Sequence, residues 1–186
     1  LRRSSAASDV YKRQILFLSI YGLDLATKTW VVENSTELRR NPIEIIDLVE
    51  GREAFLEFTY VTNPGAAWSM FSDYPGYLTI LALAALLGIF IFRKNLEIDR
   101  PPLQIMFGLI CGGICGNLTD RLFRTPAEVV DFVDVYFPFI EYDYPVFNVA
   151  DAGIFLGATT YFFWGFAESK KENLVDEKKE ASSNAS

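Results

Sequence analysis

The sequence predicts an all-α membrane protein, with four transmembrane helices and a small β-rich segment on one side of the bilayer. Hydrophobic residues make up 51% of the chain, and they lie in separate blocks of a length that suits membrane spans. Basic residues gather beside one set of block ends, as expected for the side that faces the cytoplasm. Between the first two blocks, β-like runs and a turn signal at Asn63, Pro64 and Gly65 favour strands.

Four apolar blocks define the expected spans. These spans are residues 15–32, 76–92, 103–122 and 146–167. The first block is strongly apolar only from Ile15 to Leu23, and it reaches a spanning length by including weaker residues up to position 32. In the third block Gly108, Gly112 and Gly116 recur at every fourth position, so we expect another helix to approach closely there.

The segments between the spans differ in character. Residues 33–75 are expected to form the β-rich outer segment, residues 93–102 an inner loop and residues 123–145 an outer loop. The polar, basic residues 1–14 are expected to precede the first helix as a cytoplasmic segment, and the charged residues 168–186 to form a disordered cytoplasmic tail. Eleven basic residues then lie on the inner side and five on the outer side, which places both termini inside.

The composition excludes several kinds of site. The chain has no His, so His-dependent triads and His-based metal sites are excluded. Cys111 and Cys115 share one face of the third span, where they suit apolar packing, and no further metal ligands lie near them in sequence. The net charge of −7 gives no support to nucleic-acid binding. We therefore expect no cofactor, no metal and no nucleic-acid partner.

Charged and amide side chains inside the spans are the candidate functional residues, because such groups are costly in a membrane helix. They form three groups at helical spacing: Asp24 with Lys28; Asn117 with Asp120 and Arg121; and Asn148 with Asp151. A structural interpretation remains open for the first two groups. Asp24–Lys28 and Asp120–Arg121 suit ion pairs that anchor helix ends, and the asparagines suit hydrogen bonds between helices.

Asp131 and Asp151 are harder to explain as structural charges. Apolar residues flank both, and neither has an adjacent basic residue. Two carboxylates held together share one proton, so that one activates a water as general base while the other protonates a carbonyl oxygen as general acid. The sequence offers no His and no nucleophilic elbow at Ser69 or Ser72, so a paired-aspartate hydrolase is the simplest enzyme. Asp120 remains an alternative member of the pair.

Five motifs, in this order on a four-span frame, resemble the lipoprotein signal peptidases, also called signal peptidase II. The motifs are Asp24-Leu-Ala-Thr-Lys28, Thr62-Asn63-Pro64-Gly65-Ala66-Ala67, Gly112-Gly-Ile-Cys-Gly116-Asn117-Leu-Thr-Asp120-Arg121, Val129-Val130-Asp131-Phe132 and Phe147-Asn148-Val149-Ala150-Asp151. The resemblance covers residues 15 to about 166. Trp68 departs from it, because the family usually has Phe there.

The resemblance implies an aspartyl endopeptidase of the bacterial inner membrane that cuts prolipoproteins just before a diacylglyceryl-modified cysteine. It implies Asp131 and Asp151 as the catalytic pair. It assigns binding or supporting roles to eight residues: Asp24, Lys28, Asn63, Gly65, Asn117, Asp120, Arg121 and Asn148. It also implies a periplasmic active site, contact with membrane lipids, inhibition by globomycin-like peptides and, in our interpretation, a monomer.

Two other interpretations remain open at this stage. A small proton-coupled transporter would use Asp24, Asp120 and Asp151 as a proton relay. The low number of spans and the lack of an internal repeat count against it. The other interpretation is a membrane scaffold whose charges are only structural.

Overall fold

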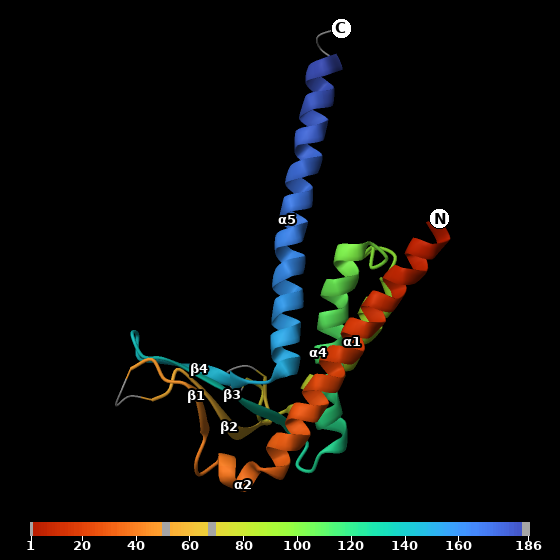
Figure 1. Cartoon of the computed structure of the whole chain (residues 1–186). Coiled ribbons are helices and arrows are strands. Elements are labelled where there is room, and N and C mark those ends of the chain that lie inside the picture. Colours follow the sequence, from red (N-terminus) through yellow and green to blue (C-terminus); the bar gives the residue numbers. More distant parts are fainter. Residues whose placement is uncertain (1, 50–52, 67–69, 184–186) are drawn as a thin grey trace.

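The structure is a computed structural model that describes residues 2–49, 53–66 and 70–183. Its helices are α1 (Arg2–Glu33), α2 (Ser35–Leu38), α3 (Pro75–Ile91), α4 (Pro101–Phe123) and α5 (Val149–Ser183). Its strands are β1 (Ile43–Ile46), β2 (Leu56–Asn63), β3 (Val129–Phe137) and β4 (Tyr142–Phe147). The sheet lies at one end of the long helices, and both termini lie at the other end (Figure 1).

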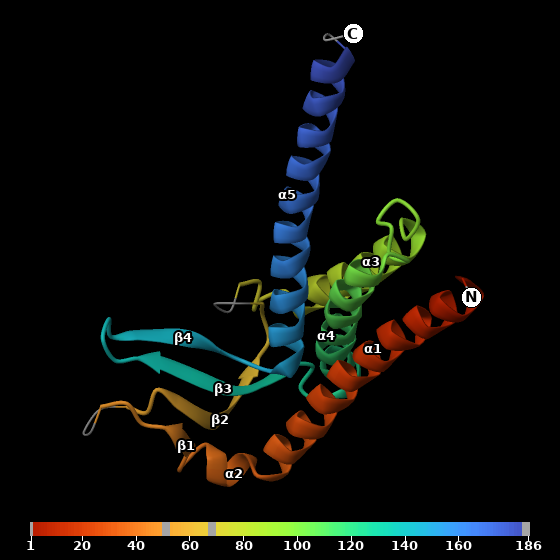
Figure 2. The ribbon, with the colours of Figure 1, turned by 45° about the horizontal axis from the view of Figure 1, so that its top comes forward.

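Helix α4 is the centre of the helical bundle. It packs against α1, α5 and α3, whereas α3 packs mainly on α4 among the helices of the described part of the chain (Figure 2). The contact with α5 is close because small residues face each other. A Cβ atom at Gly157 would lie 2.7 Å from the Met106 carbonyl oxygen, and a Cβ atom at Gly113 would overlap the Ala150 carbonyl oxygen. Two carboxylate-bearing helix ends are thereby brought together.

The strands form an antiparallel sheet in the order β1-β2-β3-β4. Its inner side packs on the end of α1 through a small apolar core. In that core Val31 of α1 and Leu38 of α2 meet Val130 and Phe132 of β3, all of them buried. Phe58 of β2 meets Phe132 edge to face, with 5.8 Å between the ring centres. This core fixes the first half of β3 against the bundle.

The β-rich character expected for residues 33–75 is confirmed by β1 and β2, but residues 123–145 were wrongly predicted as a loop. They contain all of β3 and most of β4, so an all-α description does not fit the chain. The sequence of β3, VVDFVDVYF, is rich in β-branched and aromatic residues, as strands are. Its two aspartates, three residues apart, interrupt the simple alternation by which a half-buried strand is recognised.

Several helix boundaries also differ from those predicted. Residues 2–14 are the beginning of α1 and not a separate segment, and α5 continues to Ser183 where a disordered tail was expected. Neither stretch contains Gly or Pro, and the tail is rich in Glu and Lys, so nothing in it ends a helix. Helix α5 begins at Val149 rather than at residue 146, because residues up to Phe147 belong to β4.

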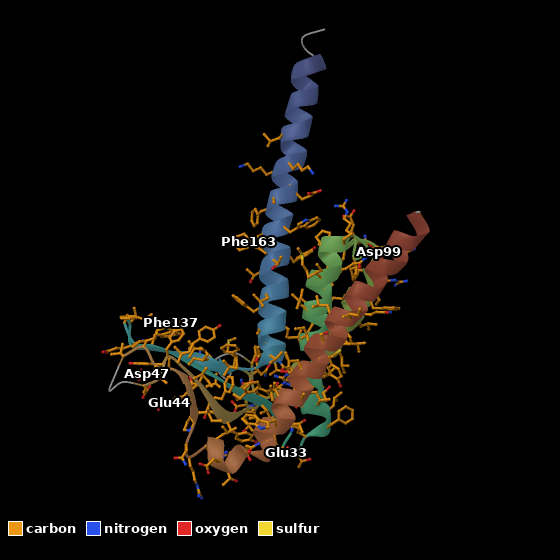
Figure 3. The ribbon with its side chains drawn as sticks, in the orientation of Figure 1. Glu33, Glu44, Asp47, Asp99, Phe137 and Phe163 are labelled. Atoms are coloured by element: carbon orange, nitrogen blue, oxygen red, sulfur yellow. The ribbon has the colours of Figure 1, made fainter. Side chains whose placement is uncertain are left out.

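The surface of the helices suits a lipid environment. Gln14–Glu33 and Pro101–Phe123 are long and apolar enough to cross a membrane, and Gly76–Ile91 is a shorter apolar helix. Large apolar side chains are exposed along α3 and α5, among them Ile80, Leu81 and Phe163. Phe163 points outward from α5, while the charged Glu33 and Asp99 lie near opposite ends of the bundle (Figure 3). The count of four spans remains a prediction, since only two helices in the described part of the chain are both long enough and apolar enough to cross a bilayer.

The close α4–α5 contact predicts that a larger residue at Gly157 is not tolerated. Gly157→Val is expected to lower the free energy of unfolding by about 1–3 kcal/mol, because the new side chain overlaps Met106 and Ile110. Thermal melts in one detergent measure the effect. Gly165→Val is the matched control on the same helix, since a Cβ atom there would have no neighbour within 4 Å. Equal melting temperatures for the two variants would contradict this packing.

Candidate active site

All ten residues predicted to form the site lie in one hydrogen-bonded network. They come from α1, α4 and α5, from β2 and the turn after it, and from β3. Each makes at least one of the bonds described below. The turn residues Ala67 and Trp68 lie outside the described part of the chain.

Lys28 is the centre of a buried ionic cluster. Its side chain is fully buried, and its Nζ lies 2.8 Å from Asp24 Oδ2 and 3.0 Å from Asp120 Oδ2. Nζ also donates a hydrogen bond to Asn117 Oδ1 at 2.8 Å. An ammonium group has three N–H donors, so all three are used. The ion pair expected between Asp24 and Lys28 is confirmed.

The expected ion pair between Asp120 and Arg121 is wrong. Asp120 pairs with Lys28 and with Arg124, and it accepts a hydrogen bond from the Val130 backbone N–H at 3.2 Å. Neighbouring residues on a helix do not face each other, whereas residues four apart do, and this favours Arg124. Arg121 instead donates to the Gly65 carbonyl oxygen at 2.8 Å, which ties α4 to the turn after β2.

Asn148 and Asp151 form a reciprocal cap at the start of α5. The Asp151 backbone N–H donates to Asn148 Oδ1 at 2.9 Å, and the Asn148 backbone N–H donates to Asp151 Oδ2 at 3.3 Å. This is the arrangement of a capping box, with Asn as the cap and Asp three residues later. A third N–H of the helix end, from Ala150, donates to Asp24 Oδ1 at 2.8 Å. The candidate catalytic carboxylate of Asp151 is thus part of the device that begins the helix.

The amide groups of Asn148 and Asn117 join the two candidate catalytic aspartates. Asn148 Nδ2 donates to Asp131 Oδ1 at 2.6 Å and to Asn117 Oδ1 at 3.1 Å. Asn117 Nδ2 donates to Asp151 Oδ1 at 2.7 Å. Because Asn117 Oδ1 receives both Lys28 and Asn148, its amide orientation is fixed by its partners. The asparagines are therefore hydrogen-bond links between elements, and they also position carboxylates.

Asp131 lies on β3, buried, with only amide groups as its hydrogen-bond donors among the described side chains. Its two oxygens accept from Asn148 and, at 3.2 Å, from Asn63 Nδ2. Burial and then the nearby charge of Asp151 raise the pKa of Asp131 from 3.8 to about 7, and the two amide bonds oppose this only in part. A carboxyl group in this state holds a proton near neutral pH and suits a general acid.

Each of the two candidate catalytic aspartates lines a cavity. A cavity of about 470 Å³ is lined by Asn63, Asp131, Asp134 and Tyr144, among others. A second cavity of about 370 Å³ has Asp151 on its wall, with apolar side chains from β3, β4 and α5 around it.

Sequence reasoning missed Arg124, which was expected only as a basic residue of the outer loop. Its spacing of four from Asp120 was the available signal. It also missed the backbone donors of Val130 and Ala150, which leave no trace in residue type. Among the described residues no group of three His, Cys, Asp or Glu side chains is placed to hold a metal ion.

Comparison with known proteins identifies the family. The family model for signal peptidase (SPase) II matches residues 16–167. The chain belongs to the signal peptidase II family. A lipoprotein signal peptidase of Acaryochloris marina (strain MBIC 11017) is 38% identical over 152 residues, which is 81% of this chain and 86% of that protein. One from Anoxybacillus flavithermus (strain DSM 21510 / WK1) is 36% identical over 149 residues, or 80% and 82% of the two chains.

Solved structures agree with this membership in signal peptidase II. One bacterial membrane enzyme superposes with a TM-score of 0.73 at 23% identity, covering 87% of this chain and 92% of that one. Another has a TM-score of 0.62 at 25% identity and covers 83% and 92% of the two chains. The first shows the likeness of fold alone. Together with the family match, these findings make the chain a membrane protein of a protease family.

The ionic cluster predicts a large effect for Lys28→Met. The substitution leaves the buried carboxylates of Asp24 and Asp120 without their shared cation, so unfolding should become easier by about 3–5 kcal/mol. Thermal melts and the amount of protein in the membrane measure this. Arg100→Gln is the control: its pair with Glu97 is half exposed, and its loss should cost less than about 1 kcal/mol. A Lys28→Met protein as stable as the control would refute a stabilising role for the cluster.

Proposed function

We propose that the protein is an intramembrane aspartyl endopeptidase that removes the signal peptide from bacterial prolipoproteins, cutting before the diacylglyceryl-modified cysteine. Membership in the signal peptidase II family supports the substrate class. One observation supports the aspartyl chemistry most: Asn148 donates to Asp131 through its side chain and to Asp151 through its backbone. Asn148 thereby holds two carboxyl groups, one from a strand and one from a helix, and each of them lines a cavity.

The two carboxyl groups have different surroundings, and we assign their roles accordingly. Asp131 is buried and holds a proton up to a pH of about 7, so it acts as the general acid. Asp151 is less buried and accepts hydrogen bonds from Asn117 and from the Asn148 backbone, as a carboxylate does. It therefore acts as the general base toward water.

The reaction then follows from these roles. Asp151 takes a proton from a water while the water oxygen attacks the scissile carbonyl carbon, and Asp131 gives its proton to the carbonyl oxygen. The resulting tetrahedral diol loses a proton from one hydroxyl back to Asp131. Asp151 passes its proton to the amide nitrogen, and the C–N bond breaks to release a carboxylic acid and an amine. Both aspartates regain their starting states, so the cycle requires no metal.

The membrane arrangement proposed here has four spans, α1, α3, α4 and α5, with both termini in the cytoplasm. The sheet and the aspartates then face the periplasm, where a translocated prolipoprotein presents its cleavage site. The termini and the sheet lie at opposite ends of the bundle, which supports this arrangement (Figure 1). Globomycin-like peptides are expected to compete for the same site, and a single chain supplies every residue of the network, consistent with a monomer.

A proton-coupled transporter finds less support. Asp24 and Asp120 are almost fully buried, and both are held by Lys28. Neither lines any of the described cavities around Asp131 and Asp151. A proton relay needs groups that can exchange protons with water and with each other in turn, and these two carboxylates are fixed as structural charges.

Replacing either candidate catalytic aspartate by its amide tests the proposal. Asp131→Asn and Asp151→Asn should each slow prolipoprotein processing at least about a hundredfold, because an amide replaces the group that carries the proton. A gel-shift assay of prolipoprotein conversion measures this at equal amounts of membrane-inserted enzyme. Asp47→Asn, exposed on the outer segment, is the matched control and should process normally. Normal processing by both aspartate variants would refute the assignment of these residues as the catalytic pair.

The raised pKa of Asp131 predicts a pH dependence. Its proton is present below about pH 7 and lost above it, so kcat/KM should fall as pH rises through this value. Between 3.8 and about 7 the folded protein binds this proton more tightly than the unfolded chain, so this group's contribution to stability is also lost as pH rises through that window.

Asn63→Ala provides the decisive comparison for the pH profile. The hydrogen bond from Asn63 favours the ionised form of Asp131, so its removal should move the falling limb of kcat/KM to higher pH. Activity profiles of the two proteins on one lipopeptide substrate measure the shift. A limb that stays in place, or moves to lower pH, would show that it does not report the ionisation of Asp131.

A further inference from the structure

A second cavity lies in the bundle, away from the aspartates. It is a cleft of about 660 Å³ between α1, α3 and α4. Its lining is mainly apolar and includes Phe17, Leu18, Leu86, Phe90, Gly108 and Cys111. On α1 the lining residues end six positions before Asp24, which is about 9 Å along the helix axis. The volume falls within the range of about 300–1,000 Å³ that is usual for small-molecule sites.

The packing of the helices explains why the cleft is open. Helices α1 and α3 both rest on α4 but make little contact with each other. Gly108 and Cys111 of α4 form part of the floor of the cleft. Both residues are small, so they leave space between α1 and α3. On the walls, Leu18 and Phe90 are more than half exposed, at 61% and 64%. In a membrane, a groove of this kind is filled by an apolar chain.

Arg93 places a positive charge at one end of this apolar cleft. It follows the end of α3 and lines the cleft together with Ile98. Its guanidinium lies 4.6 Å from the ring centre of Phe90 and donates one hydrogen bond, of 2.8 Å, to the Phe90 carbonyl oxygen. A guanidinium has five N–H donors, so others remain for a ligand. Arg93 is exposed, and these two contacts keep its guanidinium beside Phe90 at the end of the cleft.

The surroundings of Arg93 favour the binding of an anion. Within the described part of the chain, no carboxylate lies at ion-pair distance from Arg93. Arg100, in the same connection, differs: it pairs with Glu97 at 2.9 Å and with Glu168 at 3.7 Å. Asp99 marks this connection at the end of the bundle remote from the sheet (Figure 3). A planar guanidinium pairs well with phosphate, often through two parallel hydrogen bonds.

We propose that this cleft binds one anionic phospholipid of the surrounding bilayer, with an acyl chain between α1 and α3 and the phosphate at Arg93. The lipid fills the groove that the two helices leave and so holds α3, which packs mainly on α4, against α1. The basic start of a signal peptide would be repelled by Arg93, so the substrate is not the expected occupant. This inference does not depend on the proposed peptidase chemistry, although it shares the proposed membrane arrangement.

Native mass spectrometry of the full chain tests the charge requirement. Phosphatidylglycerol and phosphatidylcholine with the same acyl chains are the probes. The wild-type protein should keep one phosphatidylglycerol with about tenfold preference over phosphatidylcholine, and Arg93→Gln should remove this preference, since one charge-assisted pair is lost. Lys94→Gln is the matched control: it removes a neighbouring charge that does not line the cleft, and should keep the preference.

Alkylation of Cys111 locates the lipid. A Cys115→Ser background leaves Cys111, on the floor of the cleft, as the only thiol of the chain. In nanodiscs of phosphatidylglycerol, N-ethylmaleimide should modify Cys111 several times more slowly than in nanodiscs of phosphatidylcholine. Arg93→Gln should abolish this difference and Lys94→Gln should retain it. Equal protection in both lipids would place the phospholipid elsewhere.

Three results would overturn the proposal. The first is that Arg93→Gln keeps phosphatidylglycerol as well as the wild type does. The second is that Cys111 reacts at the same rate in both lipids. The third is that an excess of a diacylglyceryl lipopeptide displaces the phospholipid, which would assign the cleft to the substrate. Prolipoprotein processing by Arg93→Gln in detergent should stay normal, so a failure of the lipid proposal is distinguishable from a failure of the proposed peptidase function.

Discussion

The reciprocal cap between Asn148 and Asp151 is the interaction on which the candidate active site depends. A helix begins with unpaired N–H groups, and here three of them donate to side chains of Asn148, Asp151 and Asp24. The same residues also carry or position the chemistry, because Asn148 bonds Asp131 and Asp151 is the proposed base. One set of hydrogen bonds therefore both caps the start of α5 and positions the two candidate catalytic aspartates.

The buried charges around Lys28 extend this arrangement to the other helices. Lys28 holds Asp24 of α1 and Asp120 of α4, and Asp24 in turn binds the first turn of α5. Asp120 also accepts the Val130 backbone N–H, one residue before Asp131. Buried ions are costly unless each has a partner, so such a cluster specifies how the elements meet more than it adds stability. Three helices and β3 are aligned by a single ammonium group.

Much of this site could be predicted from the sequence, because its charged and amide residues lie at helical spacing. Asp24 with Lys28, and Asn117 with Asp120, share helix faces and were expected to act together. The partner of Asp120 was predicted wrongly, since residue types do not show that Arg121 would turn to Gly65 while Arg124 took its place. That Asn148 bonds to two aspartates could be seen only in the tertiary structure.

The fold was predictable where periodicity is strong and less so where elements meet. The apolar blocks identified α3 and α4 closely, and the β2 run was recognised. Strand β3 was not recognised because its two aspartates, three residues apart, break the alternation expected of a half-buried strand. The end of α5 was missed because charged helix formers and disordered tails have similar compositions.

The hairpin of β3 and β4 has a consequence for how the enzyme matures. Asp131 lies near the start of this hairpin, and Asn148 follows directly after its end, so the pairing of Val133 with Phe147 sets the distance between them. A slip of one residue would turn Asp131 to the opposite face of the sheet and move it by about 3.3 Å along the strand. The number of residues between positions 131 and 148 therefore sets how far apart Asp131 and Asn148 lie. In the proposed mechanism, a newly inserted chain therefore becomes active only once this hairpin has closed in the correct register.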